Sequence, residues 1–211
     1  MDFYFGHVSG NSARSAFALF ESGAKFTPCP TDPVKGEARQ PAYLALNPMG
    51  KVPALIDGAV RLWESNAINL YVAEQHPEAR LIPSTAAGRA SMMRWLFFQA
   101  GHVSPAVRTL MFATSKRAQE FWKPKPVDPR DVEAARAELR RYLPVLEEAL
   151  RGREWLEEQF SLADIAYTSH LWLAAEGEDG YDLSPTPAVA AWLERMLARP
   201  AWKQTMALIF P

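Results

Sequence analysis

The spacing of apolar and polar residues changes near residue 80 and divides the sequence into two parts. Before that point, short apolar stretches bounded by Gly, Pro, Asn and Asp alternate with segments of helical periodicity, which predicts the order β-α-β-α-β-β-α. After it, the periodicity is helical throughout. We therefore expect a small α/β domain at residues 1–80, a proline-containing linker around residues 77–85 and an all-helical domain at residues 86–211.

Turn-forming residues set the bounds of the predicted elements in the first part. Gly23 ends the first helix, Asp57-Gly58 predicts a tight hairpin between two strands, and Pro77 stops the last helix. Strands are expected at residues 3–7, 26–30, 53–56 and 60–63, and helices at residues 11–21, 41–46 and 65–75.

The second part has longer predicted elements. Helices are expected at residues 86–115, 129–150, from 162 onward and at 187–199, with a proline-interrupted loop around residues 123–126. Pro129 suits the first turn of its helix, because a first-turn residue needs no N–H. Ser161 and Asp164 form a variant of the capping box at the start of a largely apolar helix, so Asp164 is predicted to be structural.

Residues with binding chemistry gather around the predicted hairpin, in the segments Asn47-Pro48-Met49-Gly50-Lys51-Val52-Pro53 and Glu64-Ser65-Asn66-Ala67-Ile68. If the bond before Pro53 is cis, the backbone of Val52 faces outward, and an extended ligand can pair with it like an added strand. The Ser65 hydroxyl and the N–H groups of a helix start attract a carboxylate, whereas Glu64 attracts an ammonium. A ligand with both groups at one end is an amino acid that is joined through its side chain.

Each of these residues also has an ordinary structural explanation when it is taken alone. Ser65 is a common type of helix N-cap, Glu64 suits the positive end of a helix dipole, and Pro53 is a usual strand opener. Their order and spacing together favour a binding surface.

The two segments resemble the glutathione-binding segments of cytosolic glutathione S-transferases, and the resemblance extends over nearly the whole chain. It implies an N-terminal thioredoxin-like domain followed by an all-helical C-terminal domain. It also implies that Val52, next to Pro53, pairs with the cysteinyl backbone of glutathione. Glu64 and Ser65 would then hold the γ-glutamyl end of the same ligand.

The same resemblance assigns further residues to glutathione. Lys51 and Gln40 correspond to positions near the glycyl carboxylate, with Arg39 as an alternative to Gln40. A bacterial-type class is expected, with delta- or theta-like, beta-like and nu-like classes all left open.

The catalytic groups are expected in the turn between the first strand and the first helix. Only the thiolate form of a thiol is a good nucleophile, so the protein must supply hydrogen-bond donors and a helix N-terminus to the glutathione sulfur. Ser9 resembles the catalytic serine of delta- and theta-like classes, and Asn11 lies where nu-like members carry an asparagine. Ser12 is a second hydroxyl candidate. Ser9 and Asn11 also suit a helix cap, and capping is compatible with catalysis.

The second substrate is expected against the helical domain, at Phe98, His102 and Phe112. Aromatic residues at helical spacing more often belong to the hydrophobic core, so the assignment of these three residues to an apolar wall of the substrate site is a hypothesis. We predict a glutathione transferase that conjugates the glutathione thiolate to small hydrophobic electrophiles, a detoxification reaction. A glutathione-dependent disulfide or peroxide reductase is the alternative, and a non-catalytic binding module is a third reading that the intact Glu64-Ser65 pair and Pro53 oppose.

Composition limits the partners and the cellular setting. The net charge is −1, so nucleic acid is not an expected partner, and no stretch is apolar enough to predict a membrane span. The single Cys29 excludes an internal disulfide and favours a reducing, cytoplasmic setting without a secretory signal. The histidines and Cys29 show no metal-ligand spacing, so no metal is expected. The family resemblance implies a homodimer.

Overall fold

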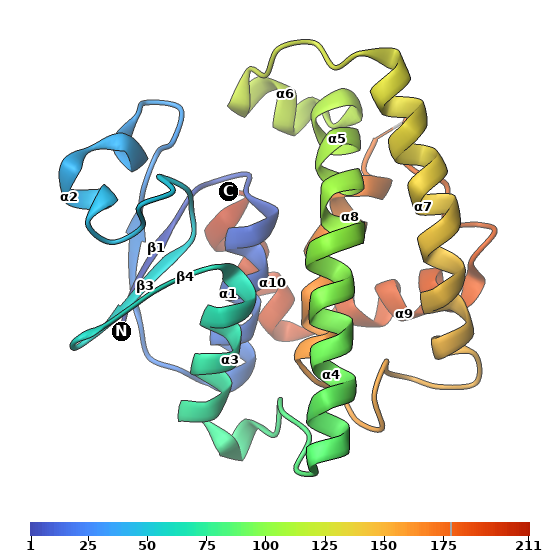
Figure 1. Cartoon of the computed structure of the whole chain (residues 1–211), viewed down its shortest axis with the longest axis horizontal. Coiled ribbons are helices and arrows are strands. Elements are labelled where there is room, and N and C mark those ends of the chain that lie inside the picture. Colours follow the sequence, from blue (N-terminus) through green and yellow to red (C-terminus); the bar gives the residue numbers. More distant parts are fainter. Residues whose placement is uncertain (178) are drawn as a thin grey trace. The chain divides into compact units, whose positions relative to one another are not determined.

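The computed structural model describes residues 1–177 and 179–211 of the chain. Its contacts form two compact units, one made of Met1–Ile82 with Arg199–Pro211 and the other of Pro83–Ala198. An α/β part followed by helices agrees with the fold class expected from the sequence (Figure 1). The residues from Arg199 onward belong to the first unit, whereas the sequence pattern placed them in the helical domain.

The first unit contains a four-stranded sheet in the order β2-β1-β3-β4. The strands are β1 (Asp2–Phe5), β2 (Thr27–Pro30), β3 (Ala54–Asp57) and β4 (Val60–Trp63). β1 and β2 are parallel, whereas β3 is antiparallel to both β1 and β4. Asp57 pairs with Val60, so the hairpin turn lies at Gly58-Ala59, one residue later than the Asp57-Gly58 motif predicted. Gly58 supplies the positive φ, 57°, that such a turn needs.

The helices of the first unit are α1 (Gly10–Ser22), α2 (Pro41–Leu44), α3 (Ser65–Gln75) and α10 (Pro200–Ile209), with short 3₁₀ turns η1 (Glu37–Arg39) and η2 (Pro77–Ala79). α1 ends at Gly23, whose φ of 71° and N–H bond to the Leu19 carbonyl confirm the predicted stop. α3 has the predicted bounds, whereas α10 was not predicted.

Helices cover both faces of the sheet (Figure 1). α1 and α3 lie side by side on one face, and α2 lies on the other. Phe3 is fully buried and contacts Phe26, which in turn contacts Phe20 of α1. Tyr4, the next residue of β1, points to the opposite face and packs on Tyr43 of α2. This alternation is the two-residue period of a strand that is covered on both faces.

α10 packs along α1 and fixes the loop after β1. Phe17 and Trp202 form an edge-on ring pair with centroids 5.4 Å apart. The Arg199 guanidinium donates two hydrogen bonds to the Glu21 carboxylate, one of them 2.9 Å long. The Val8 N–H donates to the Ile209 carbonyl at 3.0 Å, so the end of the chain holds the segment that starts α1.

The second unit is helical over its described residues, as predicted. Its elements are α4 (Ala86–Phe98), the π-helical turn η3 (Gln99–Val103), α5 (Ser104–Thr114), α6 (Lys116–Trp122), α7 (Pro129–Leu150), α8 (Leu162–Ala175) and α9 (Pro187–Ala198). The helix predicted at residues 86–115 is therefore interrupted by a π turn, and α6 was not predicted. None of the helices within the described ranges is both long and apolar enough to cross a bilayer.

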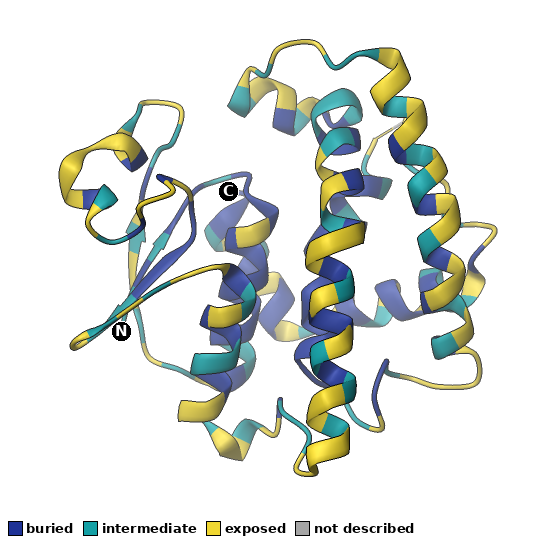
Figure 2. Ribbon diagram, viewed as in Figure 1, coloured by how far each residue is buried: buried dark blue, intermediate teal, exposed yellow. Residues whose placement is uncertain are grey.

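α8 forms the centre of the helical core, and Figure 2 shows it largely buried. The predicted capping box at its start is confirmed, because the Ser161 N–H donates to Asp164 Oδ2 while Ser161 Oγ accepts from the helix backbone. Asp164 Oδ1 also accepts from the Leu156 N–H and from Trp192 Nε1. Asp164 is therefore a structural residue, as predicted.

Candidate glutathione site

The turn that leads into α1 places Ser9 at the start of a helix. Val8 has a left-handed φ of 52°, which is uncommon for a β-branched residue and occurs where the surrounding structure enforces it. Ser9 is the N-cap, and its Oγ accepts the Ser12 N–H at 3.2 Å. The accepted bond uses a lone pair, so the Ser9 hydroxyl hydrogen remains available for another acceptor.

Asn11 and Ser12 follow within the first turn of α1 but lie in different surroundings. The Asn11 side chain is exposed, and its Oδ1 accepts from Arg14 Nη2 at 3.3 Å. Ser12 is fully buried, and its Oγ accepts the Gly6 N–H at 3.2 Å. Of the three catalytic candidates, Ser9 and Asn11 reach the helix start, whereas Ser12 points into the interior.

The loop before β3 is fixed around the Lys51 carbonyl. Both the Tyr43 hydroxyl and the Asn47 amide donate to this oxygen, each at 2.7 Å. Asn47 Oδ1 accepts the Met49 N–H at 3.0 Å. Gly50 has a φ of 59°, and a Cβ there would come within 2.9 Å of the Ala38 carbonyl oxygen, so the loop requires glycine.

Val52 follows this loop. The peptide bond between Val52 and Pro53 is cis, as the predicted outward-facing Val52 backbone required. The strand pairs of β3 begin at Ala54, so Val52 lies outside the ladder. Its side chain is buried with Tyr43 and Ala38. Lys51 on the same loop is exposed.

Gln40 and Arg39 lie next to this loop at the start of α2. Both side chains are exposed, and Gln40 is the N-cap residue of α2. The Arg39 side chain comes within 3.1 Å of the position of a Cβ on Gly50, so it lies closer to the Lys51 loop than the sequence alone indicated.

The start of α3 combines a strained acid and a buried hydroxyl. Glu64 has φ 72° and ψ 109°, and it is exposed at the N-cap position without capping the helix through its side chain. A left-handed non-glycine residue costs about 1–3 kcal/mol and tends to occur at functional sites. Ser65 is the first helical residue and is buried, with a 6% exposed fraction.

Arg14, which was not predicted as a site residue, connects the two helix starts. Its side chain is buried. Nη1 donates hydrogen bonds to Ser65 Oγ at 3.2 Å and to Asn66 Oδ1 at 3.1 Å, and Nη2 donates to Asn11 Oδ1. Arginine is seldom fully buried without polar partners. A lone arginine within the small and apolar run of residues 12–19 was the signal that could have revealed it.

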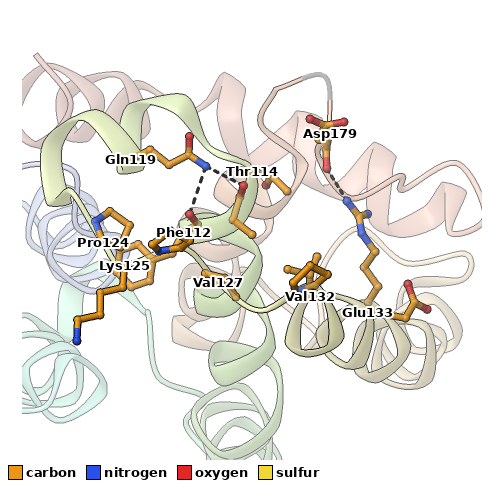
Figure 3. A pocket seen from close by; sticks show the side chains of 13 residues that line it. Phe112, Thr114, Gln119, Pro124, Lys125, Val127, Val132, Glu133 and Asp179 are labelled. Carbon is orange, nitrogen blue, oxygen red and sulfur yellow. Dashed lines mark hydrogen bonds between the residues drawn. The ribbon is translucent and has the colours of Figure 1, made fainter.

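The helical unit brings the other predicted residues together. Phe98, His102 and Tyr142 form a cluster of three rings whose centroids lie 5.4 to 5.6 Å apart. His102 and Phe112 line a cavity of about 630 Å³ between α5 and α7. Phe112 also lines a second cavity of about 650 Å³ beneath the segment that joins α6 to α7 (Figure 3).

The second cavity has a more polar wall. Figure 3 shows that the Gln119 amide donates to the backbone carbonyl of Phe112 and to that of the residue after it. Arg136 donates to the Asp179 carbonyl at 2.7 Å. The Gln119 and Arg136 side chains of this cavity wall therefore already donate hydrogen bonds to backbone carbonyls.

Cys29 supplies the single thiol of the sequence. Burial raises the pKa of the Cys29 thiol, so this group is not an activated thiolate. Among the described residues, His, Cys, Asp and Glu form no group of three that could hold a metal ion.

Comparisons with known proteins agree with this arrangement. Two family models match, the glutathione S-transferase N-terminal domain over residues 3–74 and the glutathione S-transferase C-terminal domain over residues 103–200. Glutathione S-transferase 3 of Zea mays is 36% identical over 96% of this chain and 91% of its own length. The crystal structure of glutathione transferase F2 from Populus trichocarpa has a TM-score of 0.90 at 25% identity and covers 99% of this chain and 98% of that one.

The relatives also bear on the expected class. The plant relatives include proteins of Arabidopsis thaliana and rice whose names carry the F of the phi class, so the expectation of a bacterial-type class is not supported. The disulfide-bond oxidoreductase YfcG of Escherichia coli is 29% identical over 98% of this chain and 94% of its own length.

The assignment to a family follows from three findings. These are the two-part fold, the two matching family models and the similarity to relatives over nearly the whole chain. The chain belongs to the cytosolic glutathione S-transferase family, the enzymes known as glutathione transferases.

Proposed function

We propose that glutathione lies along the first unit between the start of α1 and the start of α3. The backbone of Val52 pairs with the cysteinyl residue, next to Pro53. Ser65 and the helix N-terminus receive the γ-glutamyl carboxylate, and the exposed Glu64 receives its ammonium. The observation that carries this proposal is the fixed Lys51 carbonyl, because it leaves the Val52 backbone at a rigid edge outside the ladder.

The glycyl end of the tripeptide then extends toward the loop that precedes Val52. Lys51 is exposed there, and Gln40 and Arg39 lie close by at the start of α2. All three side chains can donate hydrogen bonds to a carboxylate. We therefore keep Lys51 and Gln40 as binding residues and Arg39 as the alternative to Gln40.

Ser9 and Asn11 act as donors to the glutathione sulfur in this proposal. A free thiol has a pKa of about 8.5, and lowering it by about two units requires about 2.7 kcal/mol of thiolate stabilisation. A hydrogen bond to a charged group contributes about 1.5–3 kcal/mol, and the helix dipole contributes about 0.3–1 kcal/mol. One or two donors at the start of α1 are therefore sufficient, and no general base is needed at the sulfur.

The thiolate forms a carbon–sulfur bond with an electrophilic carbon of a small hydrophobic compound. The displaced group leaves with its electron pair, or an activated double bond takes up the pair and a proton from water. We propose that Phe98, His102 and Phe112 of the helical unit contribute the apolar wall for this substrate. A cytoplasmic homodimer is part of the same proposal.

The Ser9→Ala and Asn11→Ala double variant tests the assignment of the donors. We expect turnover with an aryl halide to fall by about 10²-fold or more, because preorganised donors to a developing or full charge have effects of this size. Glutathione binding by calorimetry should remain within a few-fold of the parent. Unchanged turnover would reject Ser9 and Asn11 as the activating groups.

A matched control separates capping from catalysis. Thr85 caps α4 by accepting the Gly88 N–H at 3.0 Å, as Ser9 caps α1, but it lies in the helical unit. Thr85→Ala should lose a similar amount of stability, about 1 kcal/mol, and keep its turnover.

A disulfide reductase is the second candidate, and the similarity to YfcG favours it together with the exposed Asn11. In this reaction the bound thiolate attacks one sulfur of a mixed disulfide, and the other sulfur leaves as a thiolate. Rates with an aryl halide and with a mixed disulfide, measured on the same preparation, distinguish the two. A faster disulfide reaction would assign the chain to the reductase role.

A further inference from the structure

Arg14 is a buried cation placed between the two ends of the proposed glutathione site. Its exposed fraction is 3%, and one guanidinium reaches both helix starts of the first unit. Nη2 contacts Asn11 in the first turn of α1, and Nη1 contacts Ser65 in the first turn of α3. The planar guanidinium fixes the directions of its N–H groups, so these two contacts are set by one rigid fork.

The chemistry of arginine determines which atom of Asn11 faces it. A guanidinium has only donors, so the Asn11 atom within 3.3 Å of Nη2 is the carbonyl oxygen Oδ1. The NH₂ group of the same amide therefore points away from Arg14. Asn11 is exposed at the helix start, so a ligand bound there can reach this NH₂ group.

The same reasoning applies to Ser65. Its Oγ lies 3.2 Å from Arg14 Nη1 and must accept that hydrogen bond. A hydroxyl that accepts from one side directs its single hydrogen elsewhere. Ser65 thus becomes a donor, which is what a carboxylate at the start of α3 requires.

We propose that Arg14 is a positioning residue that turns the Asn11 amide and the Ser65 hydroxyl into hydrogen-bond donors for the sulfur and the γ-glutamyl carboxylate of glutathione. This inference rests on the proposed function and deepens it. Arg14 does not touch the ligand. It couples the two ends of the site, because loss of one guanidinium releases both donor groups at once.

Arg14→Met tests the coupling, since methionine fills part of the same space without any donor. The pH titration of ultraviolet absorbance from the bound thiolate gives the pKa of enzyme-bound glutathione, and steady-state kinetics give KM for glutathione. We expect the bound thiol pKa to rise by about one unit, equivalent to about 1.4 kcal/mol, and KM to rise about tenfold. A variant with the parent values for both quantities would overturn the proposal.

A double-mutant cycle with Asn11→Ala shows whether Arg14 acts through Asn11. Arg14→Met should raise the thiol pKa in the parent but add nothing in the Asn11→Ala background, because the amide that it orients is absent. A full additional rise in that background would mean that the charge acts directly on the sulfur, and the positioning role would be wrong. A loss of fold stability alone does not move a thiol pKa in this non-additive way.

Asn11→Asp provides a second test that keeps the buried arginine. A carboxylate still accepts from Arg14 and suits the first turn of α1, so the melting temperature should stay the same or rise. The outward NH₂ donor is lost, so the bound thiol pKa should rise by at least about one unit. An unchanged thiol pKa would overturn the donor role of Asn11. If the parent protein shows no heat of binding with glutathione, the proposed function fails and not this inference alone.

Discussion

At the scale of single residues, some side chains of the site could be predicted from the sequence and one could not. Ser9, Val52, Glu64 and Ser65 could be proposed in advance because turn, proline and helix-start chemistry is local. Arg14 could not, since its role follows from the packing of α1 against α3, which joins residues 51 positions apart. Local patterns predict helix starts, but they do not predict which helix starts meet.

Gly6 is a residue-scale feature whose loss should disturb Val52. A Cβ on Gly6 would lie 2.8 Å from Val52 Cγ2, closer than real contacts allow. Gly6→Ala should therefore displace Val52, destabilise the protein by about 1–3 kcal/mol and raise the Kd for glutathione about tenfold. Chemical denaturation and calorimetry measure the two effects.

A second glycine gives the control for this change. Gly101 lies in the π turn, and a Cβ there meets nothing within 4 Å. Gly101→Ala should leave glutathione binding unchanged and keep or slightly raise stability, because alanine favours helix. Equal loss of glutathione affinity in both variants would contradict the role of Gly6.

At the scale of elements, the sequence predicted the helices whose start or stop signals were recognised, whereas α6 and α10 were missed although Ser115 caps α6 and Pro200 opens α10. Gly23, Pro129 and the Ser161 capping box marked α1, α7 and α8 correctly. The π turn could not be read, because one extra residue in a helix leaves the apolar pattern nearly intact. The helix predicted to run to Arg199 corresponds to α9, whereas α10 begins directly after it at Pro200 and was not predicted.

The capping box of α8 makes stability depend on pH. Burial is the main cause that raises the pKa of Asp164 to about 6, although the three N–H donors to its carboxylate act in the opposite direction. In the unfolded chain the pKa returns to about 3.9. Between about pH 4 and 6 the folded state therefore retains a proton that the unfolded state has lost, and stability falls as pH rises by up to about 3 kcal/mol.

Asp164→Asn isolates this effect. Asparagine does not titrate, so the free energy of unfolding of the parent minus that of the variant should decrease between about pH 4 and 6 and stay constant above about pH 7. Urea denaturation at each pH gives both values. The variant should be less stable than the parent by about 1–3 kcal/mol, since its NH₂ group cannot accept the Ser161 N–H. A pH-independent difference would show that the carboxylate stays ionised.

At the scale of the whole molecule, each unit carries one part of the proposed reaction. The first unit holds the fixed Val52 loop and the two helix starts that Arg14 joins, and the second holds the ring cluster of Phe98, His102 and Tyr142. The helical unit also exposes large apolar side chains, Phe97 on α4 with a 69% exposed fraction and Val145 on α7 with 47%. On the same two helices, the ring centroids of Phe98 and Tyr142 lie 5.6 Å apart, so an aromatic contact joins α4 to α7.

An apolar surface of this kind suits contact with a second copy of the chain. Phe97→Asp places a charge at the most exposed of these side chains, and burying an unpaired charge in an interface costs several kcal/mol. We expect sedimentation velocity to show twice the mass of one chain for the parent and one chain for the variant at micromolar concentration. Arg94→Glu is the control, because this exposed side chain lies on the same helix and changes charge without removing an apolar group. A dimer that persists in Phe97→Asp would place the contact on another face, and a monomeric parent would reject the homodimer.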